Sequence, residues 1–153
     1  MVSSTASGHP LPFHVLIVDD DPADAALVSK AIDFGRFPCV VERVCDGVEA
    51  MERLYPQPGK AAESPPFPHL ILLDINMPRK NGFQVLGEIR ADPRLRHLPV
   101  VVLSTSTAER DITSAYQAGA HGYVSKPMDV DDLFQAIHGI QEYWFGVVRR
   151  PTP

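Results

Sequence analysis

Residues 15–22 read Val-Leu-Ile-Val-Asp-Asp-Asp-Pro, a short apolar run that ends in three carboxylates. A β-branched run of this length is typical of a buried strand. Asp21 followed by Pro22 is a good helix start, with Asp at the N-cap and Pro at the first helical position. The stretch therefore predicts a strand that presents acidic side chains at its carboxyl end and leads directly into a helix.

The same alternation of apolar run and amphipathic segment continues along the chain. Because the runs are continuously apolar, both faces of the sheet are expected to be covered. Five strands alternating with five helices predict a parallel α/β sheet. The further expected strands are residues 40–44, 70–73, 100–103 and 122–124, and the expected helix signals are Asp46 with Glu49, Gly82, Ser106 with Glu109, Gly119, and Asp129 with Asp132.

Composition limits the classes of function. The chain has 153 residues, 44% of them hydrophobic and 22% charged, as expected for one globular domain. The net charge is −5 and no basic run exceeds Arg149-Arg150, so we expect neither a nucleic-acid partner nor an anionic membrane surface. The longest apolar stretches fall far below the roughly 20 residues that cross a bilayer.

Segment boundaries and cysteines follow from local composition. Residues 1–13 are expected to form a flexible tail, residues 14–146 the domain, and residues 147–153 a second tail. Five prolines between residues 56 and 68 predict a long exposed loop. Cys39 and Cys45 form no CxxC pair and are expected to be inert core residues in a reduced, cytoplasmic protein.

Polar side chains follow four of the five predicted strands. In such sheets, ligands bind beyond the carboxyl ends of the strands. Asp19 and Asp20 follow the first strand and Asp74 the third, while Ser104 follows the fourth and Lys126 the fifth. Carboxylates, a hydroxyl and an ammonium are therefore expected at one edge.

The chemistry that suits this set is phosphoryl transfer to a carboxylate. Clustered carboxylates repel one another unless a cation intervenes, and Mg²⁺ prefers oxygen ligands. A metal ion and a lysine would neutralise the charge on the phosphoryl oxygens. An Asp carboxylate would be the nucleophile and would form an acyl phosphate.

Four stretches carry a resemblance to a known family. They are residues 18–22 (Val-Asp-Asp-Asp-Pro), residues 73–78 (Leu-Asp-Ile-Asn-Met-Pro) with Asn81-Gly82, residues 103–105 (Leu-Ser-Thr) and residues 123–127 (Tyr-Val-Ser-Lys-Pro). In this order they resemble the signatures of response-regulator receiver domains, from about residue 14 to about residue 145. The resemblance implies a flavodoxin-like sheet of order 2-1-3-4-5 with helices on both faces, and phosphorylation by a sensor histidine kinase.

The resemblance also implies roles for the acidic residues. Asp74 would be the phosphoacceptor. Asp20 and Asp74 would bind Mg²⁺ together with the backbone carbonyl of Asn76, and Asp19 would assist through a water molecule.

The remaining motif residues would respond to the phosphoryl group. Ser104 would be the switch hydroxyl, Tyr123 an aromatic side chain that changes rotamer, and Lys126 the amine that binds phosphate. The Lys126–Pro127 peptide bond would be cis. Thr105 stands where the family usually has Ala or Gly.

A narrower resemblance is to single-domain regulators paired with phytochrome-type kinases, through the long loop before the third strand and the aromatic end Tyr143-Trp144-Phe145. With few residues after Phe145, output is expected through protein contact. We expect homodimerisation through the last helix region, because three successive aromatics point in different directions.

Other functions remain open at this level. A haloacid-dehalogenase-like phosphatase would use Asp19 and Asp21 as a D-x-D pair, although Ala23 stands where that family has Thr or Val. A scaffold with a vestigial pocket would keep the residues without using them. A flavin carrier fits the topology but lacks a Ser/Thr/Gly-rich phosphate loop.

Overall fold

The computed structural model describes residues 11–55, 66–77 and 79–147. The expectations for residues 1–10, for residues 56–65 of the Pro-rich loop and for Arg149-Arg150 lie outside this part. The strands are β1 (Phe13–Val18), β2 (Cys39–Val44), β3 (Leu70–Leu73), β4 (Val100–Ser104) and β5 (Gly122–Ser125). The helices are α1 (Pro22–Asp33), α2 (Gly47–Leu54), α3 (Gly82–Ala91), α4 (Glu109–Gln117), α5 (Val130–Gln141) and the π-helical segment η2 (Glu142–Val147).

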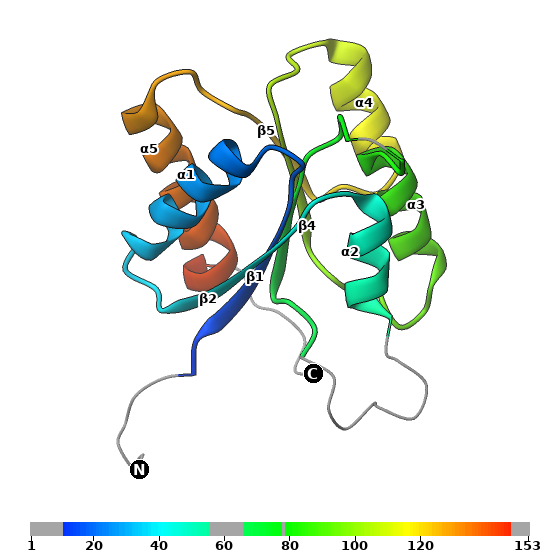
Figure 1. Ribbon diagram of the computed structural model, residues 1–153, viewed down its shortest axis with the longest axis horizontal. Coiled ribbons are helices and arrows are strands. Elements are labelled where there is room, and N and C mark those ends of the chain that lie inside the picture. The colour runs from blue at the N-terminus through cyan, green and yellow to red at the C-terminus, as the bar shows by residue number, and fades with distance from the viewer. Residues whose placement is uncertain (1–10, 56–65, 78, 148–153) are drawn as a thin grey trace.

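The five strands form one parallel sheet in the order β2-β1-β3-β4-β5 (Figure 1). The predicted flavodoxin-like fold is thus confirmed, with β3 between β1 and β4. Val18 lies opposite Leu73, and Ser104 lies opposite Ser125. This register places the residues that follow each strand at a common edge.

Both faces of the sheet are covered, as the continuously apolar strands predict. Figure 1 shows α1 and α5 on one side of the sheet and α2, α3 and α4 on the other. Within β3, Ile71 and Leu73 belong to the core beneath α2 and α3, whereas Leu70 and Leu72 belong to the core beneath α1 and α5. The two clusters share the sheet as a common wall, so each strand is held from both sides.

Most predicted helix caps are present. The Asp21 side chain accepts hydrogen bonds from the backbone N–H groups of Ala23 and Asp24 at the start of α1. Asp46 caps α2 and Asp129 caps α5 in the same manner. Gly119 has φ +107° and follows α4, which fits its predicted role as a stop signal.

The predicted cap at Ser106 is wrong. Helix α4 begins two residues later than expected, with Ala108 at the N-cap and no side-chain hydrogen bond there. The Ser106 hydroxyl donates to Asp111 Oδ2 at 2.6 Å and accepts from the N–H of Ala108. An acidic partner five residues ahead therefore outcompetes the local capping geometry.

The C-terminal aromatic residues mostly pack on their own chain. Phe145 stacks on Phe13 with ring centroids 4.1 Å apart, and Trp144 meets His121 edge to face. The Tyr143 side chain is 54% exposed. Trp144 and Phe145 thus extend into η2 the apolar contacts that α5 makes with the core.

One of the two cysteines departs from its expected position. Cys39 is half-buried but Cys45 is exposed, so the prediction of a core position for Cys45 was wrong. Strand β2 ends at Val44, which places Cys45 in the turn before α2.

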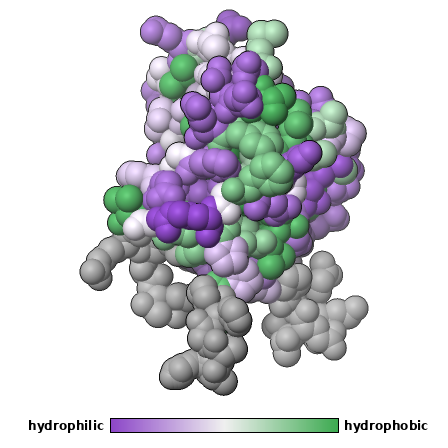
Figure 2. Space-filling model, turned by 90° about the vertical axis from the view of Figure 1, so that its left-hand side faces the viewer, coloured by the Kyte–Doolittle hydropathy of each residue, from purple (hydrophilic) through white to green (hydrophobic). Residues whose placement is uncertain are grey.

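Figure 2 shows the face that carries α1 and α5, where apolar residues gather between hydrophilic ones.

Candidate functional site

The structure brings the predicted acidic residues together at the carboxyl edge of the sheet. The N–H of Asp74 donates to the carbonyl of Val18 at 2.9 Å, which fixes the end of β3 beside the end of β1. Carboxylate oxygens of Asp19, Asp20 and Asp74 all lie within 4.8 Å of one another. Three such oxygens in this space are a donor set that fits a hard divalent cation.

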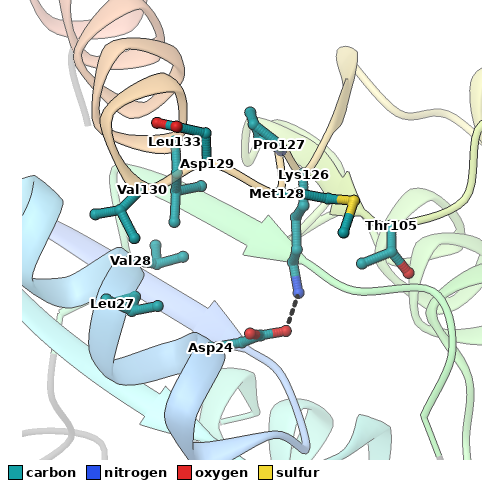
Figure 3. A pocket seen from close by; sticks show the side chains of 10 residues that line it. All are labelled: Asp24, Leu27, Val28, Thr105, Lys126, Pro127, Met128, Asp129, Val130 and Leu133. Carbon is teal, nitrogen blue, oxygen red and sulfur yellow. Dashed lines mark hydrogen bonds and ion pairs between the residues drawn. The ribbon is translucent and has the colours of Figure 1, made fainter.

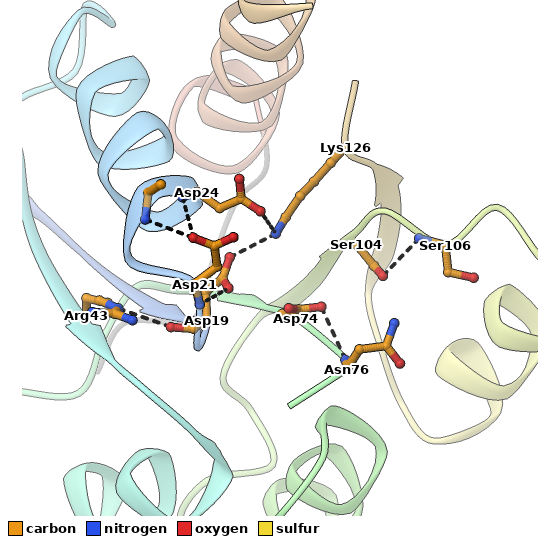
Figure 4. Close-up of polar contacts among 10 residues, drawn as sticks. Asp19, Asp21, Asp24, Arg43, Asp74, Asn76, Ser104, Ser106 and Lys126 are labelled. Atoms are coloured by element: carbon orange, nitrogen blue, oxygen red, sulfur yellow. Dashed lines mark hydrogen bonds and ion pairs between the residues drawn. The ribbon is translucent and has the colours of Figure 1, made fainter. Parts of the chain in front are cut away.

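Lys126 reaches the same cluster from the end of β5. Its N–H donates to the carbonyl of Ser104 at 2.7 Å, which anchors the start of the loop to β4. Its Nζ lies 2.8 Å from Asp19 Oδ2, and the two side chains are only 8% and 4% exposed (Figure 4). A buried ammonium paired in this manner stays charged within the acidic group.

The electrostatics of Asp74 and Lys126 reflect this crowding. Burial raises the pKa of Asp74, and the charges of Asp19 and Asp20 raise it further, against a smaller lowering by the N–H of Asn76 and by Lys126. Burial alone would lower the pKa of Lys126, but the hydrogen bond to Asp19 and the neighbouring carboxylates outweigh it, so this pKa is raised. The raised pKa of Asp74 therefore reflects mainly the loss of water around its carboxylate, and a bound cation would favour the charged form.

The loop after β3 is held close to Asp74. Asp74 Oδ1 accepts a hydrogen bond from the N–H of Asn76 at 3.2 Å. At Gly82, a Cβ atom would lie 2.6 Å from the carbonyl oxygen of Asp74 and 2.6 Å from Cα of Ile75. A residue without a side chain is therefore required where α3 begins.

Ser104 and Tyr123 meet at a shared neighbour. Ser104 is fully buried, and its Oγ accepts from the N–H of Ser106 at 3.2 Å. The Tyr123 hydroxyl donates to the carbonyl of Ser106 at 2.9 Å. The loop after β4 is thus held through both backbone groups of one residue.

The peptide bond between Lys126 and Pro127 is trans, since the described residues contain no cis bond. The expectation of a cis bond was wrong. Trans is favoured by only about 0.5–1 kcal/mol at an X–Pro bond, so residue identity alone does not decide the isomer.

Several contacts of the site were not predicted from the sequence. Asp24 places Oδ2 3.4 Å from Lys126 Nζ, and the Arg43 side chain donates to the carbonyl of Asp19 at 3.0 Å. In the loop between β3 and α3, Arg79 has φ +65° and pairs with Asp46, the cap of α2, at 2.6 Å. Each of these pairings joins segments that are distant in the chain, so no local sequence pattern indicates it.

Asp21 does not join the acidic cluster. Its carboxylate is engaged as the cap of α1, and the group of three carboxylates consists of Asp19, Asp20 and Asp74. A D-x-D nucleophile and acid pair would need Asp21 in the cluster, so the geometry gives the phosphatase alternative no support.

The sequence matches the response regulator receiver domain model over residues 15–138, and the chain belongs to this family. It is a receiver domain, a signalling module of two-component systems. No helix within the described ranges is long and apolar enough to cross a membrane.

Two curated relatives match most of the chain. The response regulator Rcp1 of Synechocystis sp. is 38% identical, with 92% of this chain and 95% of that protein aligned. The probable methanogenesis regulatory protein FilR2 of Methanothrix harundinacea is 37% identical, over 93% of this chain and 90% of that protein.

Solved structures agree with the fold. The phosphorylated cyanobacterial phytochrome response regulator RcpA superposes with a TM-score of 0.85 at 39% identity, over 93% of this chain and 100% of that one. The Mn²⁺-bound form of Rcp1 gives 0.82 at 38% identity, over 92% and 100%. The chain therefore resembles regulators of the phytochrome-associated type over nearly its whole length.

Proposed function

We propose that this receiver is phosphorylated on Asp74 by a sensor histidine kinase, in a reaction that requires Mg²⁺. The observation that carries the proposal is the meeting of Asp19, Asp20 and Asp74 within 4.8 Å, with the Lys126 ammonium paired to Asp19 at 2.8 Å. The receiver unit is proposed to span residues 14–146.

The transfer is a displacement at phosphorus. A carboxylate oxygen of Asp74 forms a bond to the phosphorus atom of a phosphohistidine, and the phosphorus–nitrogen bond breaks. Its electron pair returns to the imidazole nitrogen, which takes up a proton. The product is an acyl phosphate on Asp74 and a neutral histidine on the kinase.

Each residue of the site has a task in this step. Asp20 and Asp74 would hold Mg²⁺ together with the carbonyl of Asn76, and Asp19 would assist through a water molecule. The bound cation would neutralise charge on the phosphoryl oxygens. Lys126 would supply the second positive charge.

Ser104 and Tyr123 would report the change. A phosphoryl oxygen offers the Ser104 hydroxyl an acceptor, and turning toward it would break the contact with the N–H of Ser106. Tyr123 holds the same loop through the carbonyl of Ser106, so its side chain would follow. Phosphorylation would then reshape the surface above β4 and β5.

The test is phosphorylation by a small donor such as acetyl phosphate with Mg²⁺, followed by mapping of the modified residue. Asp74→Asn should abolish incorporation, as should chelation of Mg²⁺. Asp21→Asn is the matched control, because Asn also caps helices well and Asp21 lies outside the acidic cluster. Undiminished incorporation by Asp74→Asn would disprove the proposal.

The proposal includes the kinase partner and the cellular location. Solved neighbours that are phytochrome or bacteriophytochrome response regulators support a phytochrome-type kinase as the donor. The two free cysteines support a reducing compartment, the cytoplasm. Phosphotransfer profiling against the histidine kinases of the source cell would identify the partner by its rate.

Homodimerisation through the last helix region is the second part of the proposal. Its support is the exposure of Tyr143 (54%) and Val147 (71%) in η2. Sedimentation with and without beryllofluoride should show a dimer, and a Tyr143→Ser variant should shift it toward monomer. A wild-type monomer at all concentrations in both states would rule the dimer out.

A further inference from the structure

The Lys126 ammonium has a second carboxylate partner on helix α1. Nζ lies 2.8 Å from Asp19 and 3.4 Å from Asp24, and within the described part of the chain no hydrogen bond joins it to Asp74. Figure 4 shows the end of the Lys126 side chain between these two carboxylates, with no contact drawn to Asp74. The ammonium that should meet the phosphoryl group is therefore held by other anions.

Asp24 occupies a position from which it can hold the ammonium without belonging to the metal cluster. It lies in the first turn of α1, and its side chain is 40% exposed, whereas that of Lys126 is 8% exposed. A pocket of about 250 Å³ opens beside this pair, between α1 and the loop from β5 to α5 (Figure 3). Leu27 and Val28 form one wall of the pocket and Pro127 and Met128 the other, so Asp24 and Lys126 bridge its two sides.

Phosphoryl acquisition must disturb this arrangement. A phosphoryl group on Asp74 brings new negative charge to the cluster of Asp19, Asp20 and Asp74, and Lys126 has only one ammonium to offer. Asp24 attracts that ammonium toward α1 and away from the phosphoryl group, and this competition opposes transfer.

We propose that Asp24 is a positioning residue that competes with phosphorylated Asp74 for Lys126 and thereby slows phosphoryl acquisition. The inference rests on the proposed function of Asp74. The contact also ties the state of the acceptor to α1, because Lys126 must leave that helix when the phosphoryl group arrives.

The test measures the rate of phosphorylation by acetyl phosphate at saturating Mg²⁺, so that a change in metal affinity does not contribute. Asp24→Asn should raise the rate about 2- to 5-fold, as expected for loss of a partly exposed ion pair. Asp24→Glu keeps the charge and should restore the wild-type rate. Asp33→Asn, at the other end of α1, makes the same change in net charge and should leave the rate unchanged.

A Lys126→Met background separates competition from general charge. If Asp24 acts through Lys126, Asp24→Asn should have no effect there. An unchanged or slower rate in the single variant, or the same acceleration without Lys126, would overturn the inference.

A structure of the Mg²⁺–beryllofluoride form provides a readout that does not depend on rates. It should show Lys126 Nζ in contact with a fluoride of the beryllofluoride group on Asp74 and beyond hydrogen-bond distance of Asp24. A retained contact between Lys126 and Asp24 would count against competition.

The Asp74→Asn variant is measured beside each series and separates the two proposals. If Asp74→Asn is still phosphorylated, the proposed function fails. If Asp74→Asn is inactive but Asp24→Asn does not change the rate, only the inference about Asp24 is contradicted.

Discussion

The side chains of Arg90 and His121 are joined by a hydrogen bond of 2.9 Å from Nη2 to Nδ1. The backbone N–H of Val100 approaches the same ring nitrogen at 3.2 Å. Both partners are donors, so Nδ1 must be the acceptor and the ring proton must lie on Nε2. Partial burial of the ring lowers the pKa of His121, and the charge of Arg90 lowers it further.

This pairing predicts a pH dependence of stability. The pKa of His121 lies below its unfolded value of 6.5, so the unfolded chain takes up the proton first as pH falls. The stabilising contribution of the neutral His121 ring to the free energy of unfolding is fully present above about pH 6.5, and it is lost as pH falls through the pKa of His121 in the folded state. Urea unfolding of wild type and His121→Gln between pH 5 and 8 should show a shallower pH slope for the variant, and identical slopes would contradict the assignment.

Asp74 should reduce the stability of the metal-free protein. Its pKa is raised on folding, so the folded state binds its proton more tightly, and stability falls as pH rises through that value. In EDTA at pH 7, Asp74→Asn should therefore be more stable than wild type, by about 0.5–2 kcal/mol. The difference should narrow as pH approaches 4, and added Mg²⁺ should stabilise wild type more than the variant.

Thermal unfolding in EDTA and in Mg²⁺ measures both effects. If Asp74→Asn is less stable than wild type in EDTA at pH 7, the charged carboxylate of Asp74 is stabilised by the protein itself without a cation, and the prediction is wrong.

Gly82→Ala should disturb the acceptor site directly. The new Cβ would meet backbone atoms of Asp74 and Ile75 at 2.6 Å, and backbone cannot yield as a flexible side chain would. We expect a loss of about 1–3 kcal/mol in the free energy of unfolding, together with slower phosphorylation. Gly87→Ala is the control on the same helix, because nothing lies within 4 Å of its Cβ position.

Gly87→Ala should raise the free energy of unfolding by about 0.5–1 kcal/mol, because Ala has the higher helix propensity. Denaturant unfolding gives both values, and similar effects of the two substitutions would refute the close-contact explanation.

Ser104 and Tyr123 should be coupled through Ser106. Ser104→Ala leaves the N–H of Ser106 without its acceptor and should lower the free energy of unfolding, measured in denaturant, by about 1–3 kcal/mol. Tyr123→Phe should lower it by about 0.5–1.5 kcal/mol. Because both act on one residue, the double variant should deviate from additivity by at least about 0.5 kcal/mol. Tyr116→Phe, at an exposed side chain on α4, should add to Ser104→Ala without coupling.

The strands, most helix caps and the acidic edge could be predicted because they depend on local patterns, whereas the order of the strands was implied by the resemblance to receiver domains. Four-residue apolar runs such as residues 70–73 are too short for an ordinary helix and are typical of a buried strand, and caps such as Asp21 depend on neighbours two or three residues away. Once these strands are parallel and the first and third are neighbours, as the resemblance implies, Asp19 and Asp74 follow strands that end side by side.

Contacts that depend on how elements pack were beyond the sequence. Asp24 meets Lys126 only because α1 lies beside the loop after β5, which no local pattern encodes. The Ser106 cap failed for a related reason, since Asp111 competes for its hydroxyl. The reciprocal capping box of Asn81 and Gln84 is a local signal at the start of α3, although the predicted helix start rested on Gly82 alone.

All four residues of β3 are buried, alternating between the two cores, and the strand lies between β1 and β4. A shift of β3 would loosen contacts on both sides of the sheet at once, so a change at Asp74 must be absorbed by the loops around it. Those loops can therefore diverge to suit new binding partners while the interior stays the same. Recognition and foldability reside in separate sets of residues and can evolve independently.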